Sequence, residues 1–280
     1  MNQEIQLWET RGVKIGVTEN RAGDLLVLRC EVPKVREWEA HEILKTIKAS
    51  IANGLSHVII DEYEKLLVGR IIDDNYAYLS DLDRAILKRK VSSKLSGQDS
   101  PSPSQRHDGE SQRKSRVWAK LAEYLEREDE IVVEGFITFR LKEYLESLFD
   151  TVEDVVEDYL TEREYREFLR LLRHFMSRQK NPIRSVNVVR IEDQYRLLDD
   201  RQESVKGDVA RFLQKPPRGM DLSLDDLIVS AVVTLAPETV IWHGDIGGSP
   251  CHDLLRDLFL DHFLICQGCH LEAKDPVQEE

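Results

Sequence analysis

The sequence predicts an α+β protein, and two patterns carry this prediction. Short runs rich in β-branched residues stand towards both ends of the chain, whereas the middle carries apolar residues at helical spacing. One such stripe recurs at steps of three and four and consists of Leu141, Leu145, Leu148, Val152, Val155 and Tyr159. We therefore expect N-terminal strands plus helices, a central helical hairpin and a C-terminal mixed α/β segment.

Length and composition bound the class of protein. The 280 residues are 41% hydrophobic and 32% charged, which is enough to bury one large core or two smaller ones. No apolar run approaches the roughly 20 residues needed to cross a bilayer, and the N-terminal residues lack the pattern of a signal peptide. We expect a cytoplasmic protein without a membrane span.

The whole chain has a net charge of -13, and its excess of acidic residues lies after residue 117. Residues 118–180 hold 10 basic and 16 acidic side chains, and residues 181–280 hold 10 and 18. A field of this sign opposes nonspecific binding to nucleic acid or anionic lipid. We expect protein partners and no nucleic acid, and the sequence leaves the oligomeric state open.

The N-terminal region is expected to contain a meander of short strands followed by helices. The strand-like runs, separated by turn residues, are residues 5–8, 13–17 and 24–30. From Trp38 the apolar period becomes helical, with a stop expected at Asn53-Gly54. Residues 58–60 suit a buried strand by composition, but helical spacing continues through Ile71 and favours a helix. A further helix begins at Ser80, where Asp83 completes a capping box.

The composition changes after these helices. Residues 96–115 are rich in Ser, Gln, Pro, Gly and Asp and carry no apolar periodicity, which is typical of a flexible linker. We expect this linker to separate an N-terminal α+β unit, residues 1–95, from residues 116–280. A long insertion within one domain would look the same.

The central segment is expected to form two helices that meet near Thr161. A second apolar stripe runs from Tyr165 to Met176. Between the two stripes, Thr161 and Glu164 form a capping box, which favours a new helix start. One bent helix is the alternative, because the first stripe runs into the second with little interruption.

The C-terminal region alternates strands and helices. The expected strands are residues 185–191, 195–198 and 239–243. The expected helix starts are Ser223, with Asp226 as its capping partner, and Ser249, with Pro250 at the first helical position. Residues 262–266 fit either the last turn of the second helix or a final strand.

Several stretches resemble a known family. GFITFRLKEY from Gly135, EYREF from Glu164 and LLRHF from Leu171 are similar to segments of the YtxC-like sporulation proteins of endospore-forming bacteria. Further resemblance lies in Ser230-Ala231, Leu235 to Pro237, a strand ending in His243, and Cys266 to Cys269. The family pattern continues to a third cysteine, where this chain has His270 and Leu271 instead. The family has no established activity, so the resemblance implies a sporulation-linked bacterial protein and supplies no catalytic residues.

Eight residues of these segments are candidate family-motif positions with an expected structural role. They are Gly135, Phe136, Phe139, Arg140, Tyr144, Glu164, Tyr165 and Phe168. Arg140 and Glu164 stand among aromatic residues, so we expect a buried ion pair that joins the two helices. A catalytic acid is the alternative, but no nucleophile or base stands beside these residues at motif spacing.

The densest chemical signal lies between residues 243 and 270, which hold three of the four cysteines and four of the eight histidines. The spacing of Cys266 and Cys269 lets two thiolates reach one tetrahedral ion. We expect any zinc site to use Cys266, Cys269, Cys251 and His270, with His252 and His262 as further donors. Free thiols are the favoured interpretation, because one such pair is half of a zinc motif. No other cofactor is expected, since a thioredoxin-like dithiol or c-type haem attachment does not fit this position in the chain.

Two other patterns are weaker candidates for binding sites. The glycine-rich turn at residues 243–249 could hold an anion, and His243 and Asp245 could be metal ligands or an acid/base pair. A simple strand-to-helix connection is favoured. Four arginines at helical spacing form a basic stripe: Arg163, Arg166, Arg170 and Arg173. Neighbouring acidic residues favour a self-neutralised surface over a phosphate site.

Two functions are compatible with these patterns. The favoured hypothesis is a non-enzymatic interaction or scaffold protein that acts in sporulation. The alternative is a metal-dependent enzyme or regulator that uses the C-terminal histidines and cysteines. The sequence assigns no catalytic residue.

Overall fold

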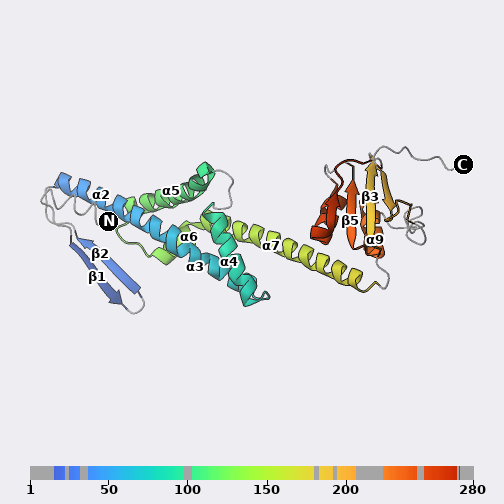
Figure 1. Cartoon of the computed structure of the whole chain (residues 1–280). Coiled ribbons are helices and arrows are strands. Elements are labelled where there is room, and N and C mark those ends of the chain that lie inside the picture. Colours follow the sequence, from blue (N-terminus) through green and yellow to red (C-terminus); the bar gives the residue numbers. More distant parts are fainter. Residues whose placement is uncertain are drawn as a thin grey trace. The chain divides into compact units, whose positions relative to one another are not determined.

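The computed structural model of the chain describes residues 16–22, 25–31, 37–97, 103–179, 183–191, 194–205, 223–244, 249–269 and 271. These residues fall into two compact units, Met1–Leu160 and Thr161–Glu280. Helices predominate in the first unit, and the second contains a four-stranded sheet with its helices (Figure 1). The predicted α+β class is confirmed.

An antiparallel hairpin precedes the helices of the first unit. Strand β1 (Gly16–Ala22) pairs with β2 (Leu25–Glu31), so that Gly16 lies opposite Glu31. The second strand is close to its expected position, whereas the first extends further along the chain than expected. The run expected at residues 5–8 lies outside the described residues.

The helical path continues through the expected stop at Asn53-Gly54. Helix α2 (Glu37–Val58) passes into a π-helical turn, η1 (Ile59–Tyr63), and then into α3 (Glu64–Asn75). The expected stop is wrong because Ala52 and Ile59 are fully buried on either side of Gly54. Their burial outweighs the cost of about 1 kcal/mol for glycine inside a helix. The preference for a helix at residues 58–60 is confirmed.

Most of the expected linker is helical. Helix α4 (Asp81–Leu95) begins as expected at Ser80, whose hydroxyl accepts a hydrogen bond from the Asp83 amide. Helix α5 (Pro103–Arg127) then takes in residues 103–115. Proline is favourable at a first helical position, and Gln, Arg, Glu and Lys have good helix propensity. The polar start of α5 is thus the beginning of a helix that packs on α2 through the buried residues Val117, Leu121 and Leu125.

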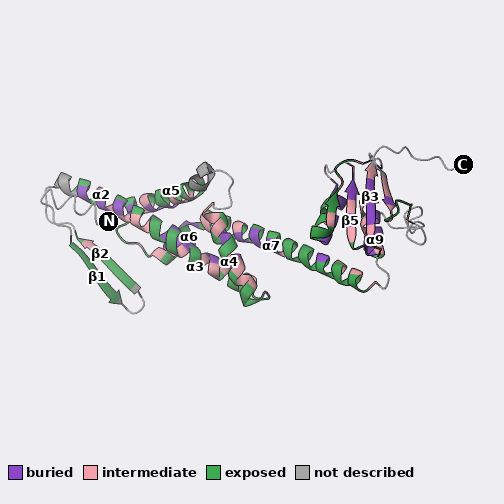
Figure 2. Cartoon of the chain, in the orientation of Figure 1, coloured by how far each residue is buried: buried purple, intermediate pink, exposed green. Residues whose placement is uncertain are grey.

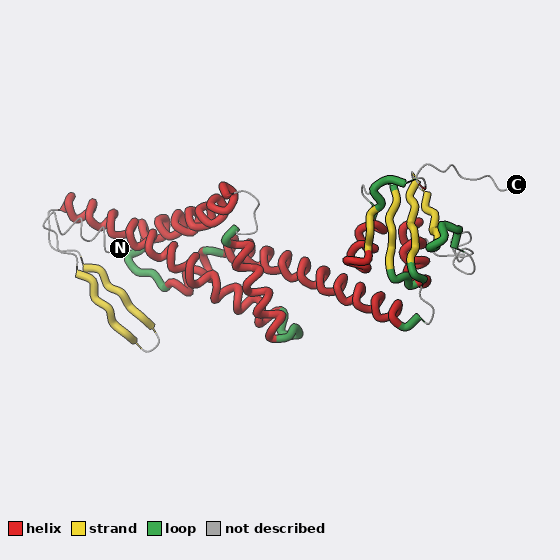
Figure 3. The backbone as a smooth tube through the Cα atoms, viewed as in Figure 1, coloured by secondary structure: helices red, strands yellow, loops and turns green. Residues whose placement is uncertain are grey.

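The expected central hairpin is replaced by one long helix. A short helix, α6 (Val133–Arg140), precedes α7 (Lys142–Ser177), which is continuous in the backbone trace (Figure 3). No glycine or proline interrupts α7, so the capping box at Thr161 offers no advantage over continued helical hydrogen bonding. The residues of α7 up to Leu160 belong to the first unit, and those from Thr161 belong to the second.

Two apolar clusters hold the first unit together, as the buried positions in Figure 2 indicate. One joins α3, α4 and the first half of α7 and includes Ile72, Leu87 and Val152. The other joins α2, η1, α5 and α6 and includes Ile59, Leu121 and Phe136. No helix in the described part of the chain is long and apolar enough to cross a membrane.

The second unit is a sheet with strand order β4-β3-β5-β6. Its strands are β3 (Ser185–Ile191), β4 (Gln194–Leu198), β5 (Thr239–His243) and β6 (Phe263–Ile265). Strands β3, β5 and β6 are parallel, and β4 is antiparallel to β3. Residues 262–266 thus contain a final strand, which was one of the two expected alternatives.

Helices cover this sheet and close its core. Helices α9 (Leu224–Leu235) and α10 (Pro250–Phe259) begin at the expected caps Ser223 and Ser249, and a short 3-10 turn, η2 (Leu260–His262), follows α10. Their apolar residues pack with Val186, Val240 and Trp242 of the sheet and with Leu169 of α7. Because β5 and β6 are parallel, their carboxyl ends lie at the same edge of the sheet. This edge carries the candidate site.

Candidate metal centre

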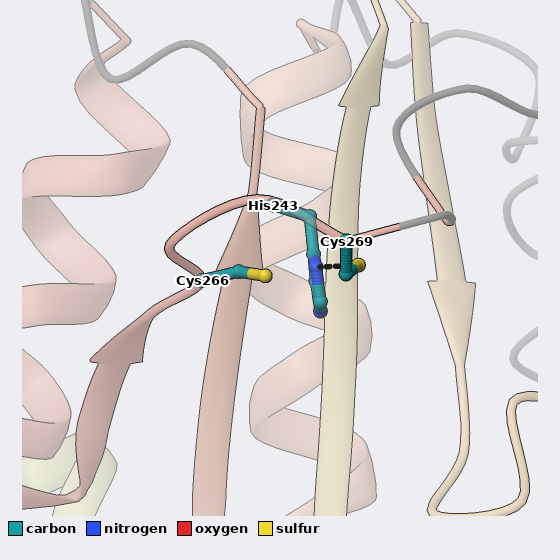
Figure 4. Close-up of side chains that lie close together, drawn as sticks. All are labelled: His243, Cys266 and Cys269. Atoms are coloured by element: carbon teal, nitrogen blue, oxygen red, sulfur yellow. Dashed lines mark hydrogen bonds between the residues drawn. The ribbon is translucent and has the colours of Figure 1, made fainter.

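Three side chains from two neighbouring strand ends converge at this edge. His243 is the last residue of β5, Cys266 follows β6, and Cys269 lies three residues further on. Their possible ligand atoms all lie within 4.8 Å of one another. Figure 4 shows the two cysteine side chains on either side of the His243 ring. The cluster therefore combines one imidazole and two thiols.

The backbone after β5 fixes the position of His243. Gly244 has a φ of +98°, and a Cβ atom there would lie 2.2 Å from the carbonyl oxygen of Arg190 on the neighbouring strand. Only glycine fits this close approach of two strands. The turn thus leaves the sheet directly after His243, whose side chain is 4% exposed.

Asn187 sets the tautomer of His243. The Asn187 side-chain amide donates to the carbonyl oxygen of Asp199 at 2.9 Å, which leaves its Oδ1 towards His243 Nε2, also at 2.9 Å. Oδ1 can only accept a hydrogen bond, so Nε2 must carry the hydrogen. In neutral His243 the lone pair is then on Nδ1. Nδ1 is the nitrogen that faces Cys269, with its sulfur 3.3 Å away.

The two cysteines are held by backbone hydrogen bonds and a tight turn. The Cys266 amide donates to the Trp242 carbonyl at 2.8 Å, which extends the pairing of β6 with β5. Gly268 adopts a φ of +106°, a value that side chains rarely allow. The sulfur of Cys269 accepts a hydrogen bond from the Leu271 amide at 3.4 Å. This hydrogen bond fixes the position of the Cys269 sulfur.

The spacing of these atoms is close to that of a tetrahedral zinc site. With Zn–S near 2.3 Å and Zn–N near 2.0 Å, the N···S and S···S separations are about 3.5 Å and about 3.8 Å. The observed N···S distance is 3.3 Å, and the whole set lies within 4.8 Å. Both cysteines are partly exposed, so solvent can reach a fourth coordination position.

The other expected metal donors lie apart from this cluster or outside the described residues. Cys251 is 1% exposed in the core between the sheet and its helices. Burial, followed by the negative charge of Asp225, raises the pKa of Cys251 to about 12, which makes this thiol a poor ligand. His262 is exposed in η2. His270 and the glycine-rich residues 245–248 are outside the described residues.

His252 has a structural environment. It is 2% exposed, and its ring meets those of Trp242 and Phe263 edge to face, with centroids 5.1 and 5.2 Å away. Its Nδ1 lies 3.2 Å from a carboxylate oxygen of Asp253. Within the described residues its Nε2 has no hydrogen-bond partner. His252 therefore packs in the core and takes no part in the three-residue cluster.

The family-motif residues of the first unit have different environments. Phe136 is 4% exposed and stacks edge to face on Tyr124, whereas Phe139 is 71% exposed. Tyr144 donates to Glu64 at 2.7 Å, and the Arg140 guanidinium lies 5.9 Å from the centre of the Tyr124 ring. The structure therefore does not gather these residues into one site.

The motif residues of the second unit lie mostly at the surface. Tyr165 donates to Asp257 at 3.0 Å and is 37% exposed, and Phe168 is 46% exposed. Arg140 and Glu164 are both exposed and belong to different units. The expected buried ion pair between them is therefore wrong. The expected helical hairpin, on which this pair depended, is not formed, because α7 continues through Thr161 as one helix.

Glu64 is a buried charged residue of the first unit that the sequence analysis did not identify. Its side chain is 9% exposed and accepts hydrogen bonds from Arg113 at 3.2 and 3.4 Å and from Tyr144. Burial, followed by the charge of Glu64, raises the pKa of Tyr144 far above its usual range. Glu64 and Arg113 line a cavity of about 300 Å³ beside the π-helical turn. The available signal was the four-residue spacing of Ile60, Glu64 and Val68, which puts Glu64 on the apolar face.

The arginine stripe is engaged within the protein. Arg173 donates to the carbonyl oxygens of Leu258 and Asp257 at 3.0 and 2.6 Å, at the end of α10. Arg166 donates to the Glu162 carbonyl, and Arg170 lies 3.9 Å from Glu167. These contacts agree with a surface whose arginines serve intramolecular partners.

Comparison with known proteins gives one family and one similar curated protein. The sequence model of the YtxC-like family matches residues 49–260. A Bacillus subtilis (strain 168) protein named "Uncharacterized protein YtxC" is 25% identical over 150 residues, which cover 52% of this chain and 50% of that protein. The chain thus spans about half the length of this curated relative. No solved structure matches the chain.

Proposed function

The chain belongs to the YtxC-like family, whose sequence model covers residues 49–260, and we propose that it acts in bacterial sporulation as a non-enzymatic, cytoplasmic protein that binds a protein partner. The sporulation role rests on the resemblance to this family. The observation that supports partner binding is the exposure of aromatic residues within the family segments.

Phe139 is the clearest of these aromatic residues. It is 71% exposed at the end of α6, while Phe136 of the same helix is buried. An exposed aromatic side chain can serve as the anchor that fills a pocket of a protein partner. Phe139 is not part of the apolar cluster that contains Phe136, so its ring is available to a partner.

The test compares two variants in sporulating cells that lack the native gene. Phe139→Ala removes the proposed contact, and Tyr78→Ala is a matched control because Tyr78 is also 71% exposed. We expect both proteins to fold, and only Phe139→Ala to fail to restore spore formation. Normal spore yield in the deletion strain would refute the sporulation role. Full complementation by Phe139→Ala would refute the binding surface.

The second candidate function is that of a metal-dependent regulator or enzyme, favoured by the cluster of His243, Cys266 and Cys269. A regulator of this kind would change its partner binding with metal occupancy. The discriminating experiment is to repeat the complementation with Cys269→Ser. Failure of this variant, in a protein that still folds, supports the metal-dependent function, whereas full complementation contradicts it.

A further inference from the structure

The three clustered side chains offer the donor set that zinc prefers. Two thiolates and one imidazole suit zinc, whereas magnesium and calcium require oxygen ligands. Within the described residues, the group contains His243, Cys266 and Cys269 and no carboxylate. The chemistry of the donors thus selects a borderline-soft divalent cation.

The environment of His243 is already arranged for coordination. Histidine ligands in metal sites usually donate their second ring N–H to a protein acceptor, which orients the ring and fixes the tautomer. Asn187 provides this acceptor, because its own amide hydrogen is used by Asp199. The Nδ1 lone pair therefore faces the sulfurs before any ion binds.

The position of the cluster in the sheet indicates what an ion would stabilise. Strand β6 has three residues and forms one edge of the sheet. Phe263 packs against the core of the second unit, whereas Leu264 and Ile265 are 50% and 47% exposed, so apolar burial holds only the start of this strand in place. An ion shared by His243 of β5 and the cysteines after β6 would connect the two strand ends directly.

We propose that His243 Nδ1, Cys266 Sγ and Cys269 Sγ bind one zinc ion that clips β6 and the chain after it to β5. Solvent completes the tetrahedron at the accessible side of the cysteines. This assignment replaces the ligand set expected from the sequence, in which Cys251 and His270 stood in place of His243. It is independent of the role in sporulation.

The experiment measures metal binding by the full-length, reduced protein. Zinc affinity is obtained by competition with a chromogenic chelator, and cobalt(II) is used as a spectroscopic probe. We expect about one equivalent of either metal, with an intense tetrahedral d–d band and a thiolate-to-cobalt charge-transfer band. We expect His243→Ala, Cys266→Ser and Cys269→Ser each to lower the zinc affinity roughly 100-fold or more. Cys30→Ser and Cys251→Ala are matched controls that retain both affinity and spectrum.

Two further measurements test the site if a ligand variant folds poorly. One is thiol alkylation of the wild-type protein, and the other is a substitution of Asn187, which contacts His243 but is not a proposed ligand. Zinc should protect two of the four cysteines of the wild-type protein from alkylation, and mass spectrometry should identify them as Cys266 and Cys269. Asn187→Leu should weaken zinc binding by about 10- to 100-fold while keeping the thiolate-to-cobalt band. No thiolate-to-cobalt band in the reduced wild-type protein would overturn the proposal. The proposal would also be overturned if Cys266 and Cys269 formed a disulfide that reductants cannot open in the folded protein, because both sulfurs would then be protected from alkylation without zinc.

Discussion

Phe136 and Phe139 are three residues apart in α6 but have opposite environments. Phe136 is 4% exposed and lies in the cluster that joins α2, η1, α5 and α6, and Phe139 is 71% exposed. We therefore expect Phe136→Ala to lower the free energy of unfolding by about 3 to 5 kcal/mol and Phe139→Ala to change it by less than about 0.5 kcal/mol. Chemical denaturation followed by circular dichroism measures both. Equal losses would show that Phe139 packs in a core.

Glu64 is the residue on which the buried polar network of the first unit depends. Removing it leaves Arg113, whose side chain is 19% exposed, without its charged partner. We expect Glu64→Ala to cost about 3 to 5 kcal/mol. Glu62→Ala, which removes an exposed partner of Lys65 in the same segment, should cost less than about 1 kcal/mol.

A double variant separates the network from the packing around it. Replacing Glu64 and Arg113 together with leucine removes both buried charges, so much of the stability should return. Urea denaturation measures the free energy of unfolding of each variant. Similar losses in the single and double variants would contradict a buried ion pair.

The residues of the candidate site differ in how well they could be predicted from the sequence. The spacing of Cys266 and Cys269 identified two of the clustered donors directly. His243 was recognised as a nearby donor but not placed in the expected ligand set, because its proximity depends on the parallel pairing of β5 with β6. Cys251 was placed in that set, although its position on α10 turns it into the core. Periodicity and motif spacing do not reveal which strands pair or which face of a helix meets the sheet.

Helix α7 offers a direct test at the level of the element. If Thr161 began a second helix, its replacement by alanine would remove an N-cap and cost about 1 kcal/mol. In the structure Thr161 is an exposed residue inside α7, where alanine has the higher helix propensity. We expect Thr161→Ala to be neutral or to stabilise the protein by a few tenths of a kcal/mol. Ser223→Ala at the observed cap of α9 is the control that should destabilise.

Tyr195 joins three elements of the second unit and links its stability to alkaline pH. Its hydroxyl donates to Asp225 of α9 at 2.6 Å and lies 2.9 Å from Ser249 at the start of α10. Burial, followed by the hydrogen bond to Asp225, raises the pKa of Tyr195 from 10.0 to about 12. Between these values the folded protein keeps a proton that the unfolded chain loses, so stability falls as the pH rises through this window.

Tyr195→Phe should reduce the slope of stability against pH between 10 and 12. Cys251, with its pKa raised from 9.0 to about 12, adds a fall of the same sign that remains in this variant. Urea denaturation at a series of pH values provides the measurement. An unchanged slope in Tyr195→Phe would mean that this hydroxyl is not held protonated by the fold.

Most elements of the chain could be predicted from local signals, and the failures share a cause. Ser80, Ser223 and Ser249 begin helices as expected, because a cap acts on its own helix. The stop at Gly54 and the flexible linker were wrong because contacts with distant residues decide both segments. Gly54 lies between Ala52 and Ile59, which are buried in the same cluster as residues of α5. The apolar residues of α5 in this cluster lie in its second half, from Val117 onwards. Such contacts are absent from any local pattern.

At the scale of the whole chain, the described residues divide into a helical unit and an α/β unit with different chemistry. The first holds its buried charge as a closed network of Glu64, Arg113 and Tyr144. The second places His243, Cys266 and Cys269 together at the edge of a sheet, partly open to solvent. The proposed metal chemistry therefore belongs to the second unit, and the exposed Phe139 proposed for partner binding belongs to the first.

Zinc K-edge X-ray absorption on the metal-loaded, full-length protein tests the proposed site most directly, because it counts the ligand atoms around the ion. We expect two sulfur atoms at about 2.3 Å and light atoms at about 2.0 Å, one of them an imidazole nitrogen. His243→Ala should remove the imidazole scattering, and Cys30→Ser should leave the spectrum unchanged. A zinc shell of nitrogen and oxygen atoms alone would contradict the assignment of His243, Cys266 and Cys269 as the metal centre.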